Sequence, residues 1–305
     1  MFKRIVFMGS PDFAVPVLNT LIESNGIIGI VTQPDRPAGR GRHLIQCVVK
    51  KEALVKKLPV FQPNNVNELD SIQYIKEWKP DLIVVAAYGQ ILKPSILEIP
   101  ECGCINVHAS LLPRWRGASP VQAAILAGDS VSGVTIIKMD EGMDSGPILA
   151  QRAVDLSANE TSQTLSIKLS LLGANLLQEI LPDYFSGNIS SSDQDTNKVT
   201  KAPLLRKIDG KLEFNKSAVE IERQVRAFHP WPGNFMEFNG QPLKVLRVRI
   251  DSIVHANPWQ RLIVNNLPVI GTNCDCVILE VVQPAGKNVM SGADFLRGAR
   301  NWITI

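Results

Sequence analysis

Apolar runs and helical patterns alternate along the first two thirds of the chain. Unbroken apolar runs predict buried strands at residues 3–9, 26–34, 81–89, 103–110 and 132–139. Apolar residues at helical spacing predict helices at residues 13–24, 71–78, 121–126 and 162–185. Continuous apolar strands that alternate with helices are typical of an α/β fold with a doubly wound, mostly parallel, Rossmann-like sheet.

The pattern changes after residue 187. Residues 188–207 are polar and lack periodicity, which predicts an extended linker. Short strand patterns with Gly and Pro turns follow, at residues 210–214, 235–238, 243–250, 261–266 and 276–282, with helical patterns at 218–228 and 292–302. Many short strands predict a small OB-like β-barrel. We therefore expect a catalytic domain at 1–189, a linker at 190–207 and a barrel domain at 208–305.

Composition indicates a soluble globular protein, because hydrophobic residues make up 45% of the 305 residues and charged residues 20%. No apolar stretch reaches the length of a membrane helix, and the apolar run at the N-terminus is too short for a secretory signal. We expect a cytoplasmic monomer with no membrane partner. The five cysteines include two C-x-C pairs without a nearby His at zinc-site spacing, so we expect reduced thiols and no metal.

Positive charge is concentrated toward the end of the chain. Residues 198–305 carry 15 Lys and Arg against 9 Asp and Glu, a net charge of +6, which favours a polyanionic partner. In the segment 32–44, Arg36, Arg40 and Arg42 alternate with Gly and Pro. That density of Gly and Pro predicts a mobile basic loop without helix or strand. The loop is suited to phosphates of an RNA, and a solvated lid over an active site is the alternative.

Candidate chemistry lies in the predicted strand 103–110. Residues two apart share a face of a strand, so Asn106 and His108 point the same way, and both lie near its carboxyl end. An imidazole transfers protons, and an Asn amide donates hydrogen bonds to a developing oxyanion. The alternative is a buried pair that only satisfies backbone groups. Cys104 faces the same side further back and no G-x-S-x-G motif occurs, which favours direct transfer over an acyl-enzyme.

Two downstream turns extend this candidate site. Ser110 begins a turn in which Leu111 and Leu112 are predicted to line an apolar pocket while backbone amides face a ligand. Asp144 lies in a Gly-rich acidic turn after the predicted strand 132–139, where its carboxylate is suited to orienting His108. The alternatives for Asp144 are an Asx turn or a metal ligand.

These motifs carry a family resemblance. The segments NVHASLLPRWRGASP and MDEGMDSGPIL, with FMGSPDFA near the N-terminus, resemble the folate-dependent formyltransferases. Three further segments, TQPDRPAGRGRHL, VRAFHPWPG and QPAGKNVMSGADFLRG, resemble the branch of that family that formylates initiator methionyl-tRNA. The resemblance covers nearly the whole chain and is weakest over residues 250–275.

The resemblance implies an activity and a set of site residues. It implies transfer of a formyl group from 10-formyltetrahydrofolate to the α-amine of methionine on initiator methionyl-tRNA. The implied catalytic residues are Asn106, His108 and Asp144. The implied folate-binding residues are Ser110, Leu111, Leu112, Pro113, Tyr88, Gly89 and Leu92. The implied tRNA-binding residues are Arg36, Arg40 and Arg42.

Three rival functions remain open from the sequence. A formyltransferase for a small amine such as a sugar nucleotide, or a formyltetrahydrofolate hydrolase, would share the catalytic motifs. A nucleotide-dependent oxidoreductase would require G-x-G-x-x-G spacing, which the turn at residues 9–12 lacks. A non-catalytic RNA-binding protein would have no need of Asn106, His108 and Asp144 together.

Overall fold

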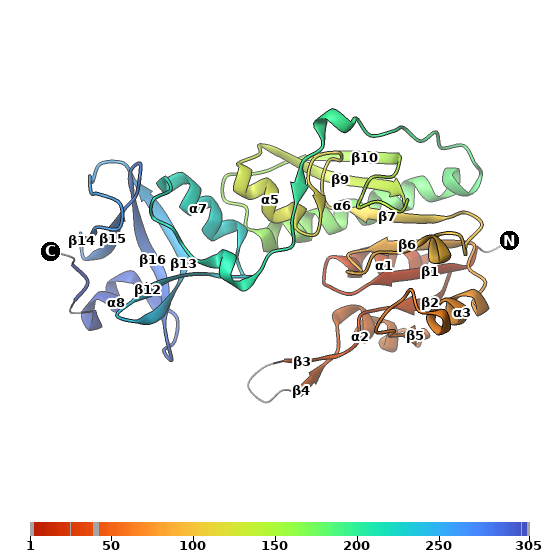
Figure 1. Ribbon diagram of the computed structural model, residues 1–305, viewed down its shortest axis with the longest axis horizontal. Coiled ribbons are helices and arrows are strands. Elements are labelled where there is room, and N and C mark those ends of the chain that lie inside the picture. The colour runs from red at the N-terminus through yellow and green to blue at the C-terminus, as the bar shows by residue number, and fades with distance from the viewer. Residues whose placement is uncertain (1–2, 25, 39–42, 300, 304–305) are drawn as a thin grey trace. The chain divides into compact units, whose positions relative to one another are not determined.

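The computed structural model describes residues 3–303 apart from residues 25, 39–42 and 300. The chain divides into two compact units (Figure 1). The first contains Met1–Pro120, Val131–Asp155 and Ser166–Pro203, and the second contains Val121–Ser130, Leu156–Leu165 and Leu204–Ile305. Most of the predicted linker therefore groups with the first unit, through Pro203.

A seven-stranded sheet forms the centre of the first unit, in the order β10-β9-β7-β6-β1-β2-β5. Its strands are β1 (Ile5–Gly9), β2 (Ile27–Val31), β5 (Val60–Phe61), β6 (Leu82–Ala86), β7 (Cys104–His108), β9 (Val131–Lys138) and β10 (Ile148–Asp155). All pairs from β5 to β7 are parallel, whereas β7–β9 and β9–β10 are antiparallel. The mostly parallel, Rossmann-like sheet is confirmed.

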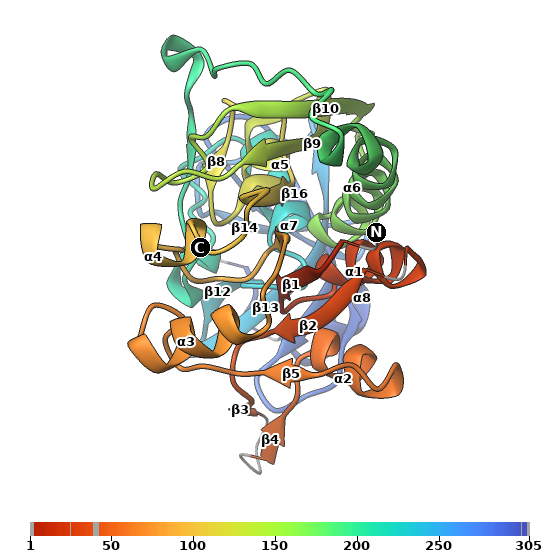
Figure 2. The ribbon, with the colours of Figure 1, turned by 90° about the vertical axis from the view of Figure 1, so that its right-hand side faces the viewer.

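Helices cover both faces of this sheet. They are α1 (Ala14–Glu23), α2 (Val48–Val55), α3 (Leu69–Glu77), α4 (Pro94–Leu97) and α6 (Ser162–Phe185), whereas α5 (Pro120–Ala127) groups with the second unit from Val121 onward. Figure 2 shows α1, α2 and α6 on one side of the sheet and α3 and α4 on the other. On the second side, apolar residues of β1, β6, α3 and α4 form one buried cluster. This two-sided cover explains why the parallel strands are apolar throughout.

The edge strand β10 was not predicted. Its exposure alternates from Ala150 to Asp155, as in a strand with one face more open to solvent than the other. The sequence ILAQRAVD therefore lacks the unbroken apolar run by which the inner strands were recognised.

The predicted linker contains ordered structure. A 3₁₀ turn, η1 (Thr196–Lys198), is followed by the short strand β11 (Lys201–Ala202). Strand β11 pairs in parallel with β8 (Arg116–Gly117), with Lys201 opposite Arg116 and Ala202 opposite Gly117. This pairing is an addition to the extended linker that the sequence predicts. The pairing escapes sequence analysis because each strand has only two residues.

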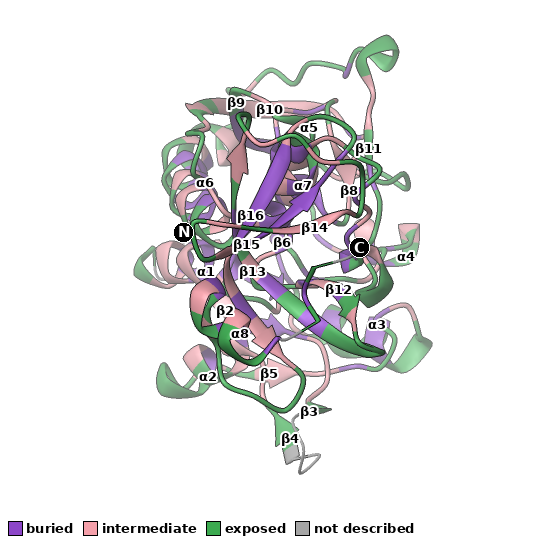
Figure 3. Cartoon of the chain, turned by 90° about the vertical axis from the view of Figure 1, so that its left-hand side faces the viewer, coloured by how far each residue is buried: buried purple, intermediate pink, exposed green. Residues whose placement is uncertain are grey.

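An antiparallel sheet forms the second unit, in the order β12-β13-β16-β15-β14, with β17 paired to β16. The strands are β12 (Asn234–Phe238), β13 (Gln241–Asp251), β14 (Arg261–Val264), β15 (Leu267–Gly271), β16 (Cys276–Pro284) and β17 (Met290–Ser291). Helices α7 (Ala218–Ala227) and α8 (Gly292–Gly298) pack on it, and Figure 3 shows the buried stretches of β13 and β16. The expected C-terminal domain of short strands is confirmed as an antiparallel sheet, and among the described residues its hydrogen-bonded order is open at β12 and β14.

One local expectation needs correction. Residues 210–214 make only one isolated bridge, from Lys211 to Phe235, after the 3₁₀ turn η2 (Lys207–Gly210). Leu212 and Phe214 are both buried, and their spacing of two gave the appearance of a strand. The divergent segment 250–275 forms the β14–β15 hairpin, whose turn residues Asn265 and Asn266 both have positive φ, as a tight hairpin requires.

The predicted basic loop contains a hairpin. Strands β3 (Arg36–Ala38) and β4 (His43–Ile45) pair in antiparallel fashion, with Arg36 opposite Ile45. The prediction that no strand forms in this segment is therefore wrong. Residues 39–42, which include Gly39 and Gly41, lie outside the described residues.

Candidate active site

Strand β7 carries Asn106 and His108 to the carboxyl edge of the parallel sheet. Ile105 and Val107 point to the opposite face, where Val107 meets Gly173 of α6. Asn106 is 9% exposed and His108 6% exposed. The apolar alternate positions therefore anchor the strand, and the polar positions share the other face.

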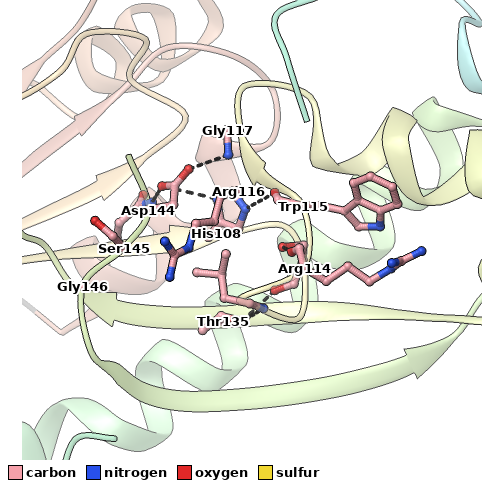
Figure 4. A network of polar contacts seen from close by, with 12 residues as sticks. His108, Arg114, Trp115, Arg116, Gly117, Thr135, Asp144, Ser145 and Gly146 are labelled. Carbon is pink, nitrogen blue, oxygen red and sulfur yellow. Dashed lines mark hydrogen bonds and ion pairs between the residues drawn. The ribbon is translucent and has the colours of Figure 1, made fainter. Parts of the chain in front are cut away.

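Asp144 joins these two side chains from the turn after β9. Its Oδ1 accepts a hydrogen bond from Asn106 Nδ2 at 3.2 Å and lies 3.6 Å from His108 Nδ1. Its Oδ2 accepts from the backbone amide of Gly117 at 2.9 Å (Figure 4). The structure thus brings together all three side chains that the sequence singled out. Asp144 has φ of 51°, a conformation that Asp adopts more readily than most residues.

The other side of the imidazole contacts the backbone. His108 Nε2 lies 3.0 Å from the carbonyl oxygen of Trp115. A carbonyl oxygen only accepts, so Nε2 carries a proton and donates it. A second proton on Nδ1 would point toward the Asp144 carboxylate, which would stabilise the imidazolium. The contact thus orders the ring between one backbone acceptor and one carboxylate.

Cys104 is not available as a nucleophile in this site. Its side chain belongs to the buried apolar cluster beneath the sheet, and its Sγ lies 3.8 Å from the carbonyl oxygen of Leu97. Burial raises the pKa of the Cys104 thiol to about 12. A thiol that stays protonated at neutral pH is a poor nucleophile, which agrees with direct transfer.

The turn after β7 is closed by its own hydrogen bonds. Ser110 donates its hydroxyl to the carbonyl of Arg114 at 2.6 Å, and Thr135 donates to the carbonyl of Ser110 at 2.6 Å. The Leu112 amide donates to Thr135 Oγ1 at 3.0 Å. The Leu112 amide therefore does not face outward as expected. Its side chain is buried, and that of Leu111 is partly exposed beside Gly133 of β9.

Three of the residues expected to bind folate, Tyr88, Gly89 and Leu92, follow the neighbouring strand β6. Tyr88 is 2% exposed and its backbone carbonyl accepts from Gln33 Nε2 at 3.2 Å. Its hydroxyl has no hydrogen-bond partner among the described residues, and burial raises its pKa. Leu92 is buried in the same apolar cluster, and Gly89 has φ of 86°. The two side chains thus lie in the core, and Gly89 offers only backbone groups.

The basic residues are only partly described. Arg36 lies exposed on β3 and donates to Gln33 Oε1 at 3.3 Å. Arg40 and Arg42 lie outside the described residues. Within the described ranges, no group of three or more His, Cys, Asp and Glu side chains is arranged to hold a metal ion. In the same ranges, no helix has both the length and the apolar content to span a bilayer.

Sequence analysis missed three residues beside this site. The guanidinium of Arg116 donates twice to Gln194 Oε1, from Nε at 2.9 Å and Nη2 at 2.8 Å. Thr200 accepts at its hydroxyl from the Trp115 amide at 2.8 Å. Gln194 and Thr200 lie in the predicted linker, where no periodic pattern marks buried positions.

Comparisons with known proteins match both the N-terminal and the C-terminal part of the chain. Residues 3–181 match the family model described as formyl transferase, and residues 204–300 match that of the formyl transferase C-terminal domain. A methionyl-tRNA formyltransferase of Chloroflexus aggregans is 43% identical over 300 residues, which are 97% of this chain and 97% of the relative. One from Myxococcus xanthus is 42% identical over 302 residues, 97% of this chain and 95% of the relative.

Solved structures share the fold. An N-formyltransferase from Helicobacter canadensis, in complex with folinic acid and dTDP-3-aminofucose, has a TM-score of 0.68 to this chain at 18% identity. The match covers 93% of this chain and 100% of that one. At this identity the likeness concerns the fold alone.

Proposed function

Because this chain belongs to the formyl transferase family, we propose that it transfers the formyl group of 10-formyltetrahydrofolate to the α-amine of methionine on initiator tRNA. The observation that carries this proposal is the 43% identity to a methionyl-tRNA formyltransferase over 97% of both chains. The C-terminal part is included in that match, so the substrate is inferred from the whole chain and not from the catalytic motifs alone.

In the proposed reaction, the neutral amine bonds to the formyl carbon, and the bond from that carbon to the folate N10 then breaks. The proton that the amine loses finally resides on N10. Asn106 Nδ2 donates one hydrogen to Asp144 and has a second hydrogen for the oxyanion that forms between these steps. The charged form of His108 stabilises the same oxyanion by its positive charge. Asp144, 3.6 Å from His108 Nδ1, stabilises the imidazolium and orients the ring.

The folate would bind along the carboxyl ends of β6 and β7. This proposal rests on the placement of Gly89, whose missing side chain leaves its backbone open to a flat ring, and on Leu111, which is partly exposed. Open α/β sheets bind ligands at this edge. In the proposal Ser110, Leu112 and Pro113 shape the pocket from behind, through the turn that Ser110 and Thr135 close.

The tRNA is assigned to the two basic parts of the chain. Arg36, Arg40 and Arg42 supply positive charge from one hairpin segment, and residues 198–305 carry a net charge of +6. Arginines neutralise phosphates and release counterions, so binding should weaken as salt concentration rises. We further propose that the enzyme is a cytoplasmic monomer with the domain limits 1–189 and 208–305.

A direct assay tests this function. Purified protein, 10-formyltetrahydrofolate and methionyl initiator tRNA should yield formylmethionyl-tRNA, with methionyl elongator tRNA and uncharged initiator tRNA as poor or inert controls. An amino-sugar nucleotide and a reaction without any amine test the two rival activities. Formylation of the sugar, or release of formate without an acceptor, combined with an inert methionyl-tRNA would reject the proposal.

A further inference from the structure

The segment 192–202, named here the strap, passes beside both loops of the candidate active site. It starts at Ser192, which exchanges two backbone hydrogen bonds with Ile148 of β10, at 2.8 and 2.9 Å. It ends at β11, which pairs with β8. Between these anchors most of its side chains are exposed, while Gln194 is 8% exposed. One buried polar side chain in an otherwise solvated segment requires a physical reason.

Gln194 uses the full hydrogen-bonding capacity of its amide. Its Oε1 accepts both bonds from Arg116, and its Nε2 donates to the carbonyl oxygens of Asp144 at 2.9 Å and Gly146 at 2.7 Å. A buried amide with every donor and acceptor paired is held in one orientation. It therefore joins the backbone of the Asp144 turn to Arg116 of β8.

Thr200 holds the neighbouring residue of the same loop. Its hydroxyl accepts from the Trp115 amide at 2.8 Å, and its carbonyl accepts from the Arg116 amide at 2.9 Å. Trp115 has φ of 64°, a region that a bulky residue adopts only when its surroundings impose it. This conformation directs the Trp115 carbonyl to His108 Nε2.

We infer that Gln194 and Thr200 are positioning residues of the formyl-transfer site, which act through Asp144 and through the Trp115 carbonyl. The inference rests on the proposed function. Both residues converge on backbone groups whose own conformations have positive φ, at Asp144 and Trp115. Loss of either should leave the catalytic side chains present but misplaced, and misplacement by about 1 Å costs up to about a hundredfold in rate.

Gln194→Ala and Thr200→Val test the strap. Each should lower kcat about tenfold to a hundredfold, with KM for both substrates changed by less than about threefold. Asp193→Ala is the matched control for the first variant, because Asp193 is an exposed neighbour in the strap. Thr200→Ser is the control for the second, since it restores the hydroxyl, and it should recover most of the lost kcat. Normal kcat in folded Gln194→Ala and Thr200→Val protein would overturn the inference.

A double variant separates positioning from a general structural role. In an Asp144→Ala background, adding Gln194→Ala should change kcat by less than about twofold, because the carboxylate that it positions is absent. An equal loss of kcat in both backgrounds would reject positioning. If Gln194→Ala does not fold, the Thr200→Val and Thr200→Ser pair decides.

Hydrogen exchange of the backbone amides of residues 115–117 tests the strap independently of catalytic activity. Exchange should be faster in Thr200→Val than in the wild type and restored in Thr200→Ser. If the wild type fails to formylate methionyl-tRNA while this exchange pattern is observed, the proposed function is rejected, and the structural role of the strap is still supported. Unchanged exchange in Thr200→Val would reject the strap whatever the activity.

Discussion

The backbone amide of Gly117 donates a hydrogen bond to Asp144 Oδ2 at 2.9 Å, so a residue without a side chain holds one oxygen of the carboxylate. Gly117 has φ of 120°, and a Cβ on it would lie 2.6 Å from the carbonyl oxygen of Ala202. The position therefore requires glycine for both conformation and space.

Gly117→Ala should lower both stability and activity. Relief of the close contact must displace β8 or β11, at a cost of about 1–3 kcal/mol in unfolding free energy. Chemical denaturation measures this loss, and kcat should fall because the Asp144 contact moves. Gly187→Ala is the control, since Gly187 has φ of 72° and a Cβ on it would meet nothing within 4 Å. An equal loss in both variants would attribute the effect to backbone conformation alone.

Asp144→Asn should reduce kcat on the order of a hundredfold or more while the protein stays folded. The amide preserves the shape of the side chain but removes the charge that stabilises the His108 imidazolium. Steady-state kinetics at pH 7 would measure the loss. Glu141→Gln, an exposed residue of the same turn, should retain the wild-type rate. A rate within threefold of the wild type in Asp144→Asn would remove the carboxylate from the mechanism.

Asn106→Ala and His108→Ala should each lower kcat about a hundredfold or more, because the first removes a hydrogen-bond donor and the second a positive charge that stabilise the proposed oxyanion. Their combined loss should be smaller than the product of the single losses, since both side chains stabilise one oxyanion. Circular dichroism would check that each variant is folded. Independent, fully multiplicative losses would argue that the two side chains act in different steps.

Cys104→Ala should keep a kcat close to that of the wild type. Burial holds the pKa of the Cys104 thiol at about 12, so a covalent formyl-thiol route is closed at neutral pH. Stability should fall slightly because a small cavity remains in the apolar cluster. Exposed Cys274→Ala is the control for general effects of cysteine loss. A large loss of kcat confined to Cys104→Ala would revive the acyl-enzyme route.

The start of α7 gives a prediction for stability and pH. Ser217 and Glu220 form a capping box, in which the backbone amide of each residue donates to the side chain of the other. Ser217→Ala should cost about 1 kcal/mol in unfolding free energy.

The hydrogen bonds from Ser217 lower the pKa of Glu220. The stability that this carboxylate contributes is therefore complete above its unfolded pKa of about 4.3 and is lost as pH falls through its folded pKa. Glu220→Gln should thus lower the melting temperature at pH 7, and the difference from the wild type should shrink in acid. Glu237→Gln on β12 tests for a general effect of charge. A difference that grows on acidification would contradict this assignment.

Strong periodic patterns predicted most of the fold. The inner strands were recognised because burial on both faces of the sheet requires unbroken apolar runs. Helix α6 was recognised because burial of one face of a long helix requires apolar residues at helical spacing. Strand β10, the β3–β4 hairpin and the β8–β11 pair were missed because edge strands and two-residue strands leave no such pattern. Their pairing depends on tertiary contacts.

Some residues of the candidate site could likewise be predicted from the sequence, and others could not. Asn106 and His108 could be placed by strand alternation, and Asp144 by its acidic turn. Gln194 could not, because its burial depends on Arg116 and on two backbone carbonyls from a turn 48 and 50 residues away. The Leu112 amide was misjudged because Thr135, which binds it, lies 23 residues further along the chain.

The position of β11 bears on how the protein matures. During synthesis, Asn106, His108 and Asp144 emerge from the ribosome long before Ala202. The loop that contacts His108 is nevertheless complete only when β11 pairs with β8. Catalytic competence should therefore appear late in synthesis. A fragment that ends at the predicted boundary of residue 189 would keep Asn106, His108 and Asp144 and would lack the strap.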